Sequence, residues 1–324
     1  MVNLAVVIVT AKPGVDLKRC LVSLTLQKFT EFDVIVVCSG CAAPEKPDSF
    51  LAGDLAKRTR FVATTNRGYG AACNLGARSS DAAYLVFLND DTQLHPDCLQ
   101  SLYNSLSRDE SNILQPLIFH EYTRRVMRGN PCDIYGAAGL WFYGNCGEGE
   151  FYVSGASLAL SKSIFERLGG FDEKLFLYHD DVDLSWRARL MGYGIACVEA
   201  AICKHSGGAS SGKIPHATKF YLTQRNRIRV IIKNYSTRRM LTRGAITCIM
   251  IIAGGTFLTI TARKVQYVTS ACKAFAWNLL ELKSTLTERY RIQGKRVQDD
   301  EVIERTMSRF SMDLCVLKRR IIGA

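Results

Sequence analysis

The chain has 324 residues, of which 48% are hydrophobic and 22% are charged. This composition is typical of a globular protein with one large domain, or a domain with an appendage, and it excludes disorder, collagen and a continuous coiled coil. The formal charge of +12 is unevenly distributed, because residues 1–210 carry −3 and residues 211–324 carry +15. We therefore predict a slightly acidic body followed by a basic region whose charge requires a partner.

Four apolar runs in the first ninety residues alternate with segments of helical periodicity. The runs have the composition of strands and cover Leu4–Val9, Val34–Val37, Arg60–Ala63 and Tyr84–Leu88. Helical segments between strands indicate right-handed crossovers, so we predict an α/β fold with a mostly parallel sheet flanked by helices. Ligands of such sheets bind beyond the carboxyl ends of the strands, where we expect the functional residues.

The rest of the chain divides into three parts. Residues 110–150 are interrupted by glycines and predict a loop-rich connection beside a substrate site. Further elements are predicted at Ala156–Leu160 (strand), Ser161–Leu168 (helix), Val182–Met191 (helix) and Ile195–Val198 (strand). Long basic helices are expected after Gly212, so we divide the chain into a catalytic domain, residues 1–212, and a helical C-terminal region, residues 213–324.

An uncharged stretch, Ala245–Ala262, lies between basic clusters. Its eighteen residues are at the lower limit for a membrane-spanning helix, and two glycines and four threonines weaken it further, so we favour a buried or interfacial hairpin. With the neighbouring basic charge, the stretch resembles an anchor that binds an anionic membrane surface. Packing against the catalytic domain or within a homodimer is the alternative.

Twelve cysteines are scattered along the chain, and only Cys38 and Cys41 have a C-x-x-C spacing. No second pair completes a zinc site, so we interpret most cysteines as small buried apolar residues in a reducing compartment. The first residues run into an apolar strand without a basic leader. We expect a cytoplasmic protein that is peripheral at the inner face of the cell membrane.

Two adjacent carboxylates, Asp90 and Asp91, follow Asn89 directly after the fourth apolar run. Adjacent carboxylates repel each other unless a cation or hydrogen-bond donors compensate them. Such a pair suits Mg²⁺ or Mn²⁺, because these ions bind a few carboxylates together with the phosphate oxygens of a substrate. The alternative is a solvated acidic turn that caps the next helix.

A second acidic cluster, Asp180, Asp181 and Asp183, lies at the start of the predicted helix Val182–Met191. The helix dipole favours an anion at this position, which accounts for one carboxylate but not for two or three. An ionised carboxylate at the edge of a pocket acts as a general base toward a hydroxyl group. We therefore expect a general base in this cluster.

Two segments with glycines complete the candidate site. Asn66–Gly76 follows the third apolar run and opens a helix, so its backbone N–H groups can meet the phosphates or sugar of a nucleotide, although its glycines miss the G-x-G-x-x-G spacing. His205 precedes a glycine pair. A structural role and a ligand-binding role both remain open for this histidine.

Five segments, taken in order, resemble the family 2 glycosyltransferases, and in particular their rhamnosyltransferase-like branch. They read V-I-V-T, N-R-G-Y-G-A-A-C-N-L-G, L-N-D-D-T, G-G-F-D-E-K-L-F-L-Y-H-D-D-V-D-L-S-W-R and K-H-S-G-G-A-S. The resemblance covers residues 3–235, and Ala276–Leu279 with the basic helix after it resembles the C-terminal region of that branch. It implies a GT-A fold, a nucleotide-sugar donor, a divalent metal (Mn²⁺ or Mg²⁺) and inversion at the anomeric carbon.

The resemblance also assigns roles to individual residues. Asp91 matches the last acid of a DxD-like motif that contacts the metal and the diphosphate, and His205 resembles a histidine that some members use as a metal ligand. Asp181 matches the expected base in the family's E-D pair, and Asp180 takes the glutamate position. The implied donor-binding residues are Thr10, Ala11, Cys38, Asn66, Gly68, Asn74, Asn89 and Asp90.

Cys38 departs from the family pattern. The family usually has V-V-D-N-G-S after the second strand, whereas this chain reads Val36-Val37-Cys38-Ser39-Gly40-Cys41. A thiol does not accept the charge-assisted hydrogen bonds that a carboxylate accepts from a nucleotide. We expect the substitution to affect donor affinity or the identity of the nucleotide.

Three hypotheses for the function follow from the sequence. The first is an inverting glycosyltransferase that moves a sugar from dTDP-rhamnose or a UDP-sugar to a hydroxyl group of a glycan or lipid-linked acceptor. The second is nucleic-acid binding through the closely spaced basic residues Arg225, Arg227, Arg229 and Lys233. The alternative for these residues is a solvated helix face. The third is thiol–disulfide exchange at Cys38 and Cys41.

Overall fold

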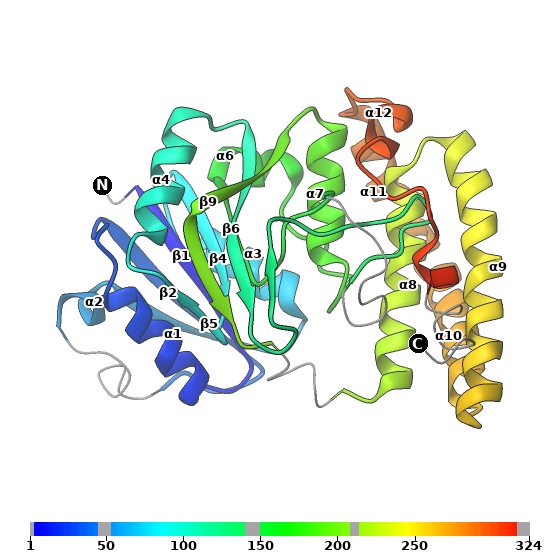
Figure 1. Cartoon of the computed structure of the whole chain (residues 1–324), viewed down its shortest axis with the longest axis horizontal. Helices are drawn as coiled ribbons and strands as arrows, with labels where there is room; N and C mark the ends of the chain where they lie inside the picture. Colours follow the sequence, from blue (N-terminus) through cyan, green and yellow to red (C-terminus); the bar gives the residue numbers. More distant parts are fainter. Residues whose placement is uncertain (1–2, 45–52, 140–149, 208–213, 316–324) are drawn as a thin grey trace. The chain divides into compact units, whose positions relative to one another are not determined.

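The computed structural model describes residues 3–44, 53–139, 150–207 and 214–315. The chain forms two compact units. The sheet unit consists of Met1–Gly129, Val153–Leu184 and Tyr193–Lys213. The helical unit consists of Asn130–Tyr152, Ser185–Gly192 and Ile214–Ala324 (Figure 1). Its first two segments precede residue 213, and no sequence pattern predicted that they belong to this unit.

The N-terminal half of the sheet is parallel. Its strands are β1 (Leu4–Thr10), β2 (Phe32–Ser39), β3 (Thr59–Thr64) and β4 (Tyr84–Asn89), in the spatial order β3-β2-β1-β4. All four strands were predicted: β1, β2 and β4 are buried apolar runs, and β3 is a partly exposed strand at the edge of the sheet. The register pairs Thr10 with Cys38 and Val9 with Asn89, so the ends of β1, β2 and β4 lie at one edge of the sheet.

The other half of the sheet is mixed. Its strands are β8 (Ser157–Ser161), β6 (Asn112–His120), β9 (Gly194–His205), β5 (Thr92–Leu94) and β7 (Arg125–Met127). Strand β8 is antiparallel to β4 and β6, β6 is parallel to β9, and β5 is antiparallel to β9. The predicted α/β fold is confirmed, with a sheet that is parallel in its first half and mixed in its second.

Strands β6 and β7 correct the prediction that residues 110–150 form a loop-rich connection. Pro116 lies in the middle of β6, and the register between β6 and β9 shifts between Pro116 and Leu117. Proline in a strand is tolerated at such irregularities, but it argues against a strand in the sequence. The neighbouring glycines added to that signal, so the strand was missed.

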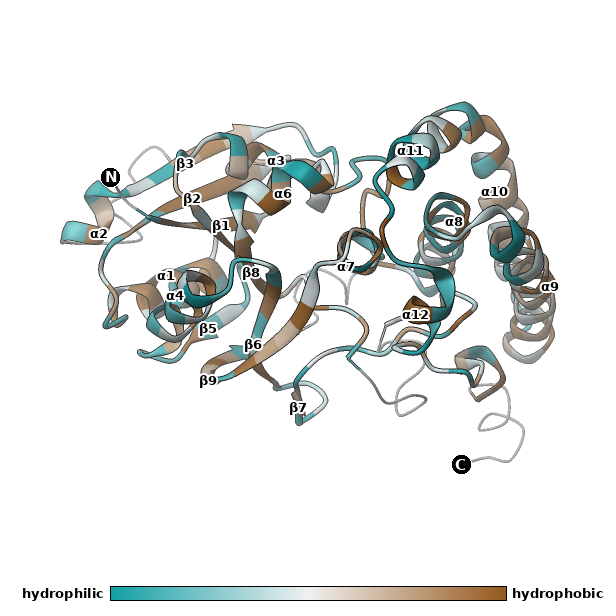
Figure 2. Ribbon diagram, turned by 90° about the horizontal axis from the view of Figure 1, so that it is seen from above, coloured by the Kyte–Doolittle hydropathy of each residue, from teal (hydrophilic) through white to brown (hydrophobic). Residues whose placement is uncertain are grey.

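Helices cover both faces of the sheet. The helices of the sheet unit are α1 (Val15–Thr25), α2 (Asp54–Lys57), α3 (Tyr69–Arg78), α4 (Cys98–Arg108) and α6 (Lys162–Leu168). Helix α7 (Asp180–Leu190) begins in the sheet unit, and its residues from Ser185 onward belong to the helical unit. Helices α3 and α6 lie on one face, and α1 and α4 on the other (Figure 2). Helix α3 packs closely on β1 because Gly76 has no side chain; a Cβ there would lie 2.3 Å from Cγ1 of Val7.

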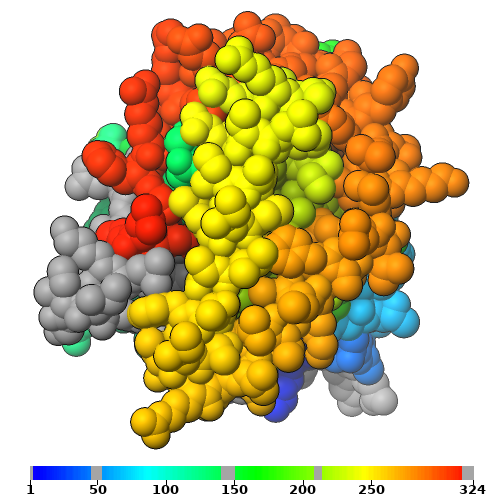
Figure 3. Space-filling view, turned by 90° about the vertical axis from the view of Figure 1, so that its right-hand side faces the viewer, coloured from blue at the N-terminus to red at the C-terminus, as the bar shows by residue number. Residues whose placement is uncertain are grey.

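The helical unit is built around α8 (His216–Asn234). Helix α8 packs against α9 (Thr237–Ala262), α10 (Gln266–Leu280) and α11 (Leu282–Gly294), and the short α12 (Asp300–Glu304) follows. Phe220 and Ile228 of α8, Ile251 of α9 and Ala271 of α10 form an apolar core between the three longest helices. Helices α9 and α10 lie side by side on one face of this unit (Figure 3).

The basic residues of α8 are buried, which corrects both sequence interpretations of them. Arg225 is 8% exposed, and Arg227, Arg229 and Lys233 are each 1% exposed. Side chains that are buried among helices neither contact a nucleic acid nor form a solvated face, so nucleic-acid binding through α8 is not favoured.

Specific partners compensate these buried cations. Arg227 donates to the backbone oxygen of Tyr135 at 2.7 Å and to Asp313 at 2.8 Å. Arg229 donates to Oγ1 of Thr285 at 2.6 Å. The guanidinium of Arg225 lies over the ring of Trp277 at 4.5 Å. Much of the basic charge of this region therefore holds the helices together.

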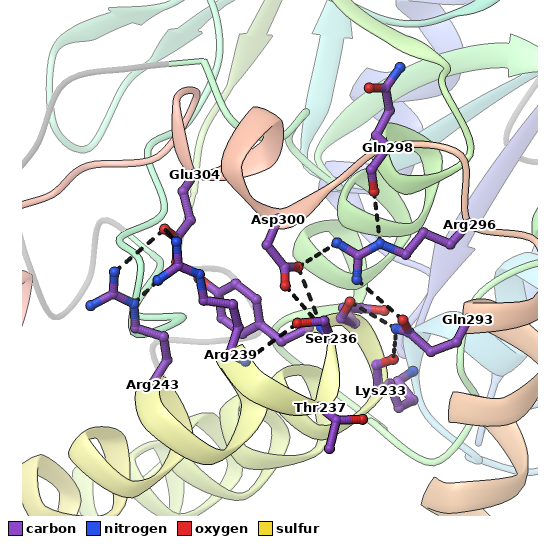
Figure 4. A network of polar contacts seen from close by, with 12 residues as sticks. Lys233, Ser236, Thr237, Arg239, Arg243, Gln293, Arg296, Gln298, Asp300 and Glu304 are labelled. Atoms are coloured by element: carbon purple, nitrogen blue, oxygen red, sulfur yellow. Dashed lines mark hydrogen bonds and ion pairs between the residues drawn. The ribbon is translucent and has the colours of Figure 1, made fainter.

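A second polar network fastens α12 to the start of α9 (Figure 4). Asp300 accepts hydrogen bonds from Nη2 of Arg296 at 2.6 Å and from the backbone nitrogen of Ser236 at 3.1 Å. Glu304 pairs with Arg243 at 3.1 Å and with Arg239 at 3.3 Å. Two arginines of the first turns of α9 thereby share one carboxylate partner inside the unit.

Candidate active site

The acidic turn Asp90-Asp91 follows β4 at the carboxyl edge of the parallel strands. The side chain of Thr10, the last residue of β1, is 1% exposed and donates a hydrogen bond to Oδ2 of Asp90 at 2.6 Å. Burial raises the pKa of Asp90 to about 6, and the hydrogen bond from Thr10 opposes this shift. Asp90 is therefore fixed to the end of β1.

Asp91 faces His205 at the end of β9. The register of β5 and β9 pairs Thr92 with His205, and Nε2 of His205 lies 3.1 Å from Oδ1 of Asp91. Burial raises the pKa of Asp91, but the hydrogen bond and charge of His205 outweigh this effect and lower the pKa below its usual value. The structure thus brings together the two residues that were predicted as metal ligands.

His120, the last residue of β6, extends this pair and was not predicted. Its Nε2 atom lies 3.0 Å from Nδ1 of His205, because β6 and β9 pair these two residues in register. Burial and the neighbouring His205 lower the pKa of His120 to about 4, so its ring is neutral at neutral pH. The sequence offered no signal for this contact, since it depends on the missed strand β6.

The Asp91–His205 pair suits a divalent metal. Two ligands of one ion at right angles, with bonds of about 2.1–2.2 Å, are about 3 Å apart, which matches the observed separation. A carboxylate with an imidazole fits Mn²⁺ well, and His120 gives the ring of His205 the second partner that ligating histidines usually have. The described residues contain no group of three or more potential ligands, so a bound ion would need further oxygens.

Asp181 lies in the first turn of α7 and is held by backbone donors. Its Oδ2 accepts from the nitrogen of Gly155 and its Oδ1 from the nitrogen of Val182, each at 2.9 Å. Burial raises the pKa of Asp181, and these hydrogen bonds oppose the shift. The nitrogen of Asn89 donates to the oxygen of Ala156 at 3.0 Å, so the segment that holds Asp181 is also tied to the end of β4.

Asp180 has a different environment from that of Asp181. It is 4% exposed, and its Oδ1 has no hydrogen-bond partner among the described residues. Burial, together with the charges of Asp181 and Asp172, raises the pKa of Asp180 well above its usual value. The burial and the two neighbouring charges disfavour the ionised form of Asp180, whereas the backbone donors of Gly155 and Val182 favour the ionised form of Asp181, so Asp181 is the member of the pair better suited to accept a proton.

Tyr69 contacts two segments next to Asp181: the one that contains Gly155, and the loop before α7. Its hydroxyl donates to the oxygen of Gly155 at 2.6 Å, and its nitrogen donates to the oxygen of Phe176 at 2.8 Å. Gly68 allows this approach, because it has a φ of +98° and a Cβ there would lie 2.3 Å from the oxygen of Phe176. The role of Tyr69 was not predicted from the sequence.

The remaining predicted donor-binding residues fall into two groups. Ala11 is exposed after the end of β1, and Asn66 accepts a hydrogen bond from the nitrogen of Gly68 at 3.1 Å. Asn74 is 6% exposed, and its amide binds both the nitrogen (2.8 Å) and the oxygen (3.0 Å) of Phe171. The polar atoms of Asn74 are thus used within the protein.

Cys38 is fully buried in β2. Burial, with a contribution from the neighbouring Cys41, raises the pKa of its thiol to about 12. Thiol–disulfide exchange requires an accessible thiolate near neutral pH, so the burial and raised pKa of Cys38 do not favour that hypothesis.

Comparisons with known proteins show a family and a fold that this chain shares. Residues 5–168 match the sequence model of the family described as "Glycosyl transferase family 2". The N-acetylglucosaminyl-diphospho-decaprenol L-rhamnosyltransferase of Mycobacterium tuberculosis is 28% identical over 244 residues, which are 65% of this chain and 78% of that protein.

Solved structures show the same fold, GT-A. A complex of GalNAc-T7 with UDP, GalNAc and Mn²⁺ has a TM-score of 0.59 and 16% identity, and the match covers 89% of this chain and 58% of that chain. The mannosyltransferase PcManGT from Pyrobaculum calidifontis, in complex with GDP-Man and Mn²⁺, has a TM-score of 0.54 and 12% identity, covering 99% of this chain and 87% of that chain.

Proposed function

The chain belongs to glycosyl transferase family 2, and we propose that it is an inverting, metal-dependent transferase. The donor is a nucleoside-diphosphate sugar, dTDP-rhamnose or a UDP-sugar, and the acceptor is a hydroxyl group of a glycan or a lipid-linked glycan. The rhamnosyltransferase of M. tuberculosis supports dTDP-rhamnose as the first donor to test. The protein is proposed to act in the cytoplasm, where such donors are made.

One observation supports the chemistry most strongly. Asp181, which is suited to accept a proton, and the Asp91–His205 pair, which is suited to a metal, both lie in the sheet unit, and Gly155-Ala156 connects Asp181 to the end of β4. A base and a site for the donor diphosphate are the two elements that an inverting transfer requires.

Asp91 and His205 would hold Mn²⁺ or Mg²⁺, with the donor diphosphate supplying further oxygens. A divalent ion bound there offsets the charge that develops on the departing diphosphate. Asp90, fixed by Thr10, and Asn89 shape the turn on which Asp91 lies. Ala11, Asn66 and Gly68 remain our proposal for residues that contact the donor. Thr10 and Cys38, whose side chains are buried, are proposed to shape this edge from below, and Asn74 positions the loop at Phe171.

Asp181 accepts the proton of the acceptor hydroxyl. The hydroxyl oxygen forms a bond to the anomeric carbon of the donor sugar, and the bond from that carbon to the diphosphate breaks on the opposite face, which inverts the configuration. The raised pKa brings the basicity of Asp181 closer to neutral pH, where general bases are most efficient. Asp180, whose pKa is raised by burial, lies next to the base in the chain.

Purified protein incubated with a panel of nucleotide sugars and a lipid-linked glycan acceptor, with Mn²⁺, Mg²⁺ or EDTA, tests the proposal. We expect release of nucleoside diphosphate that depends on the acceptor and on the metal, and a product whose anomeric configuration is inverted by NMR. Retention of configuration, or full activity in EDTA, would contradict the assignment.

A further inference from the structure

Helix α9 presents an apolar stripe to solvent. Leu241, Ile249, Ile252 and Ile260 are between 53% and 69% exposed. Their spacing of eight, three and eight residues places them on one side of a helix of 3.6 residues per turn. We name these four residues the α9 stripe; Figure 3 shows the face of the helical unit that α9 crosses.

The opposite side of α9 is packed inside the unit. Thr247, Ile251 and Gly255 are buried, and Thr247 donates to the oxygen of Tyr135 at 3.0 Å. A Cβ on Gly255 would be 3.4 Å from Cβ of Ala271 in α10. Helix α9 therefore has a protein-facing side and a separate apolar side that is exposed among the described residues of the unit.

Cations lie at both ends of the α9 stripe. Arg238 precedes it, Lys264 follows it, and Lys273 lies on the adjacent α10; all three are exposed, and none pairs with a carboxylate among the residues that the structure describes. Arg239 and Arg243, by contrast, are paired with Glu304 (Figure 4). The network thus engages the side chains of Arg239 and Arg243 within the unit, whereas Arg238, Lys264 and Lys273 are available at the surface.

Carboxylates are absent from this part of the sequence. No Asp or Glu occurs between Glu199 and Glu281, a range that contains all of α8, α9 and α10. Neither α9 nor α10 therefore supplies an acidic residue that could neutralise the cations around the stripe. An apolar strip with an all-cationic rim matches a surface whose interior is apolar and whose headgroups are anionic.

We propose that the α9 stripe and its cations form the surface by which the protein binds an anionic lipid membrane. The stripe extends about 29 Å along the helix, at 1.5 Å per residue, so α9 lies flat with its apolar side among the headgroups. The inference concerns the helical unit alone and stands whether or not the proposed transfer reaction is correct.

A second copy of the chain fits this surface less well. Symmetric pairing of two stripes would place Arg238 opposite either Arg238 or Lys264 of the other copy, and like charges in an interface are unfavourable. A spanning α9 also fits poorly, although α9 is the one described helix long and apolar enough to cross a membrane. Insertion would break the contacts of Thr247, Arg239 and Arg243.

Flotation of the full-length protein with lipid vesicles tests the proposal. We expect binding to phosphatidylcholine vesicles that contain phosphatidylglycerol, weak binding to phosphatidylcholine alone, and a loss of binding as salt rises from about 0.05 to about 0.5 M. Absence of binding to the anionic vesicles at low salt would overturn the proposal.

Two variants and a matched control locate the surface. Ile249→Glu/Ile252→Glu and Lys264→Glu/Lys273→Glu should each weaken vesicle binding about tenfold or more, because each lysine contributes about 1 kcal/mol and a carboxylate resists burial among headgroups. The control, Val22→Glu/Leu26→Glu, changes two exposed apolar residues of the sheet unit, one in α1 and one directly after it (45% and 60% exposed), and should bind as the unmodified protein does.

Two other results would also overturn the proposal, because each assigns the α9 stripe a different partner. Binding that survives carbonate extraction would show that α9 spans the membrane. A dimer that the Ile249→Glu/Ile252→Glu variant dissociates, with vesicle binding unchanged, would assign the stripe to a second copy. Melting curves followed by circular dichroism show whether the variants fold, and the substitution of the exposed lysines provides a test that leaves the apolar residues intact.

Discussion

Replacement of Asp181 by Asn separates the chemical role of this residue from its structural one. Both carboxylate oxygens accept backbone hydrogen bonds, from Gly155 and from Val182, each at 2.9 Å. An amide has a single acceptor oxygen, so in Asp181→Asn one of the two N–H groups faces an NH₂ donor. The variant therefore loses the base and also disturbs the first turn of α7.

The two losses have different magnitudes. Removal of a general base typically lowers kcat by ~10²–10⁴. An unsatisfied buried N–H group costs about 1–3 kcal/mol of stability, which lowers Tm by several degrees for a protein of this size. The pH profile changes as well: Asp181 acts as an anion, so in the unmodified enzyme kcat falls as the pH falls through its raised pKa, and the variant should lack this limb.

Asp133→Asn provides a matched control in the helical unit. The carboxylate of Asp133 accepts backbone hydrogen bonds from Tyr135, Ala137 and Met312, at 2.8–2.9 Å, so the amide causes the same kind of conflict away from the proposed chemistry. For Asp133→Asn we expect a lower Tm and a kcat within a few-fold of normal. For Asp181→Asn we expect both a lower Tm and a much lower kcat.

Nucleoside diphosphate release at saturating donor and acceptor, measured from acidic to alkaline pH, provides the assay, with calorimetry for donor binding. A kcat for Asp181→Asn within about tenfold of normal, with donor binding intact, would refute the assignment of Asp181 as the base. An equal loss of kcat in Asp133→Asn would show that general destabilisation explains the result.

Three further substitutions test the rest of the site. Tyr69→Phe removes the hydrogen bond to Gly155 and should lower kcat about tenfold with little change in the donor KM, because positioning of the base is weakened; an unchanged pH profile and kcat would limit Tyr69 to a structural role. Asp91→Ala should weaken donor binding in calorimetry with Mn²⁺ and should not be rescued by excess metal; equal affinity with and without EDTA in the unmodified protein would contradict a metal site there. Cys38→Asp places a carboxylate in a fully buried position of β2, so we expect a lower Tm that recovers at acidic pH, where the carboxyl group is neutral. An unchanged Tm would show that the surroundings of residue 38 are polar.

The parts of the fold that depend on local patterns were predictable. The buried parallel strands β1, β2 and β4 are continuous apolar runs, and in such sheets functional residues follow the strand ends, which places Thr10, Cys38 and Asn89 at one edge. Asp91 and His205 were singled out separately, but only the antiparallel pairing of β5 with β9 brings them within 3.1 Å.

The parts that depend on pairing over long distances were not predictable. His120 reaches His205 through a strand that Pro116 obscures in the sequence. Tyr69 reads as one residue of a glycine-containing helix start, and nothing local shows that its hydroxyl meets Gly155, the residue that holds Asp181. Backbone contacts of this kind carry no sequence pattern, because any residue type supplies the carbonyl oxygen.

The charge of the C-terminal region illustrates the limit of composition most clearly. Residues 211–324 carry +15, yet Arg227 and Arg229 are 1% exposed, and Arg243 is paired with Glu304. The formal charge already includes the carboxylates of the region, so these pairs do not lower it. Burial instead keeps the guanidinium groups of Arg227 and Arg229 from direct contact with an anionic partner. What remains outside is a small set of cations, including Arg238 and Lys264, next to the exposed side of α9. Their position beside apolar side chains, rather than their number, is what distinguishes a lipid surface from a nucleic acid as the partner, because a phosphate backbone offers no apolar layer to receive the α9 stripe.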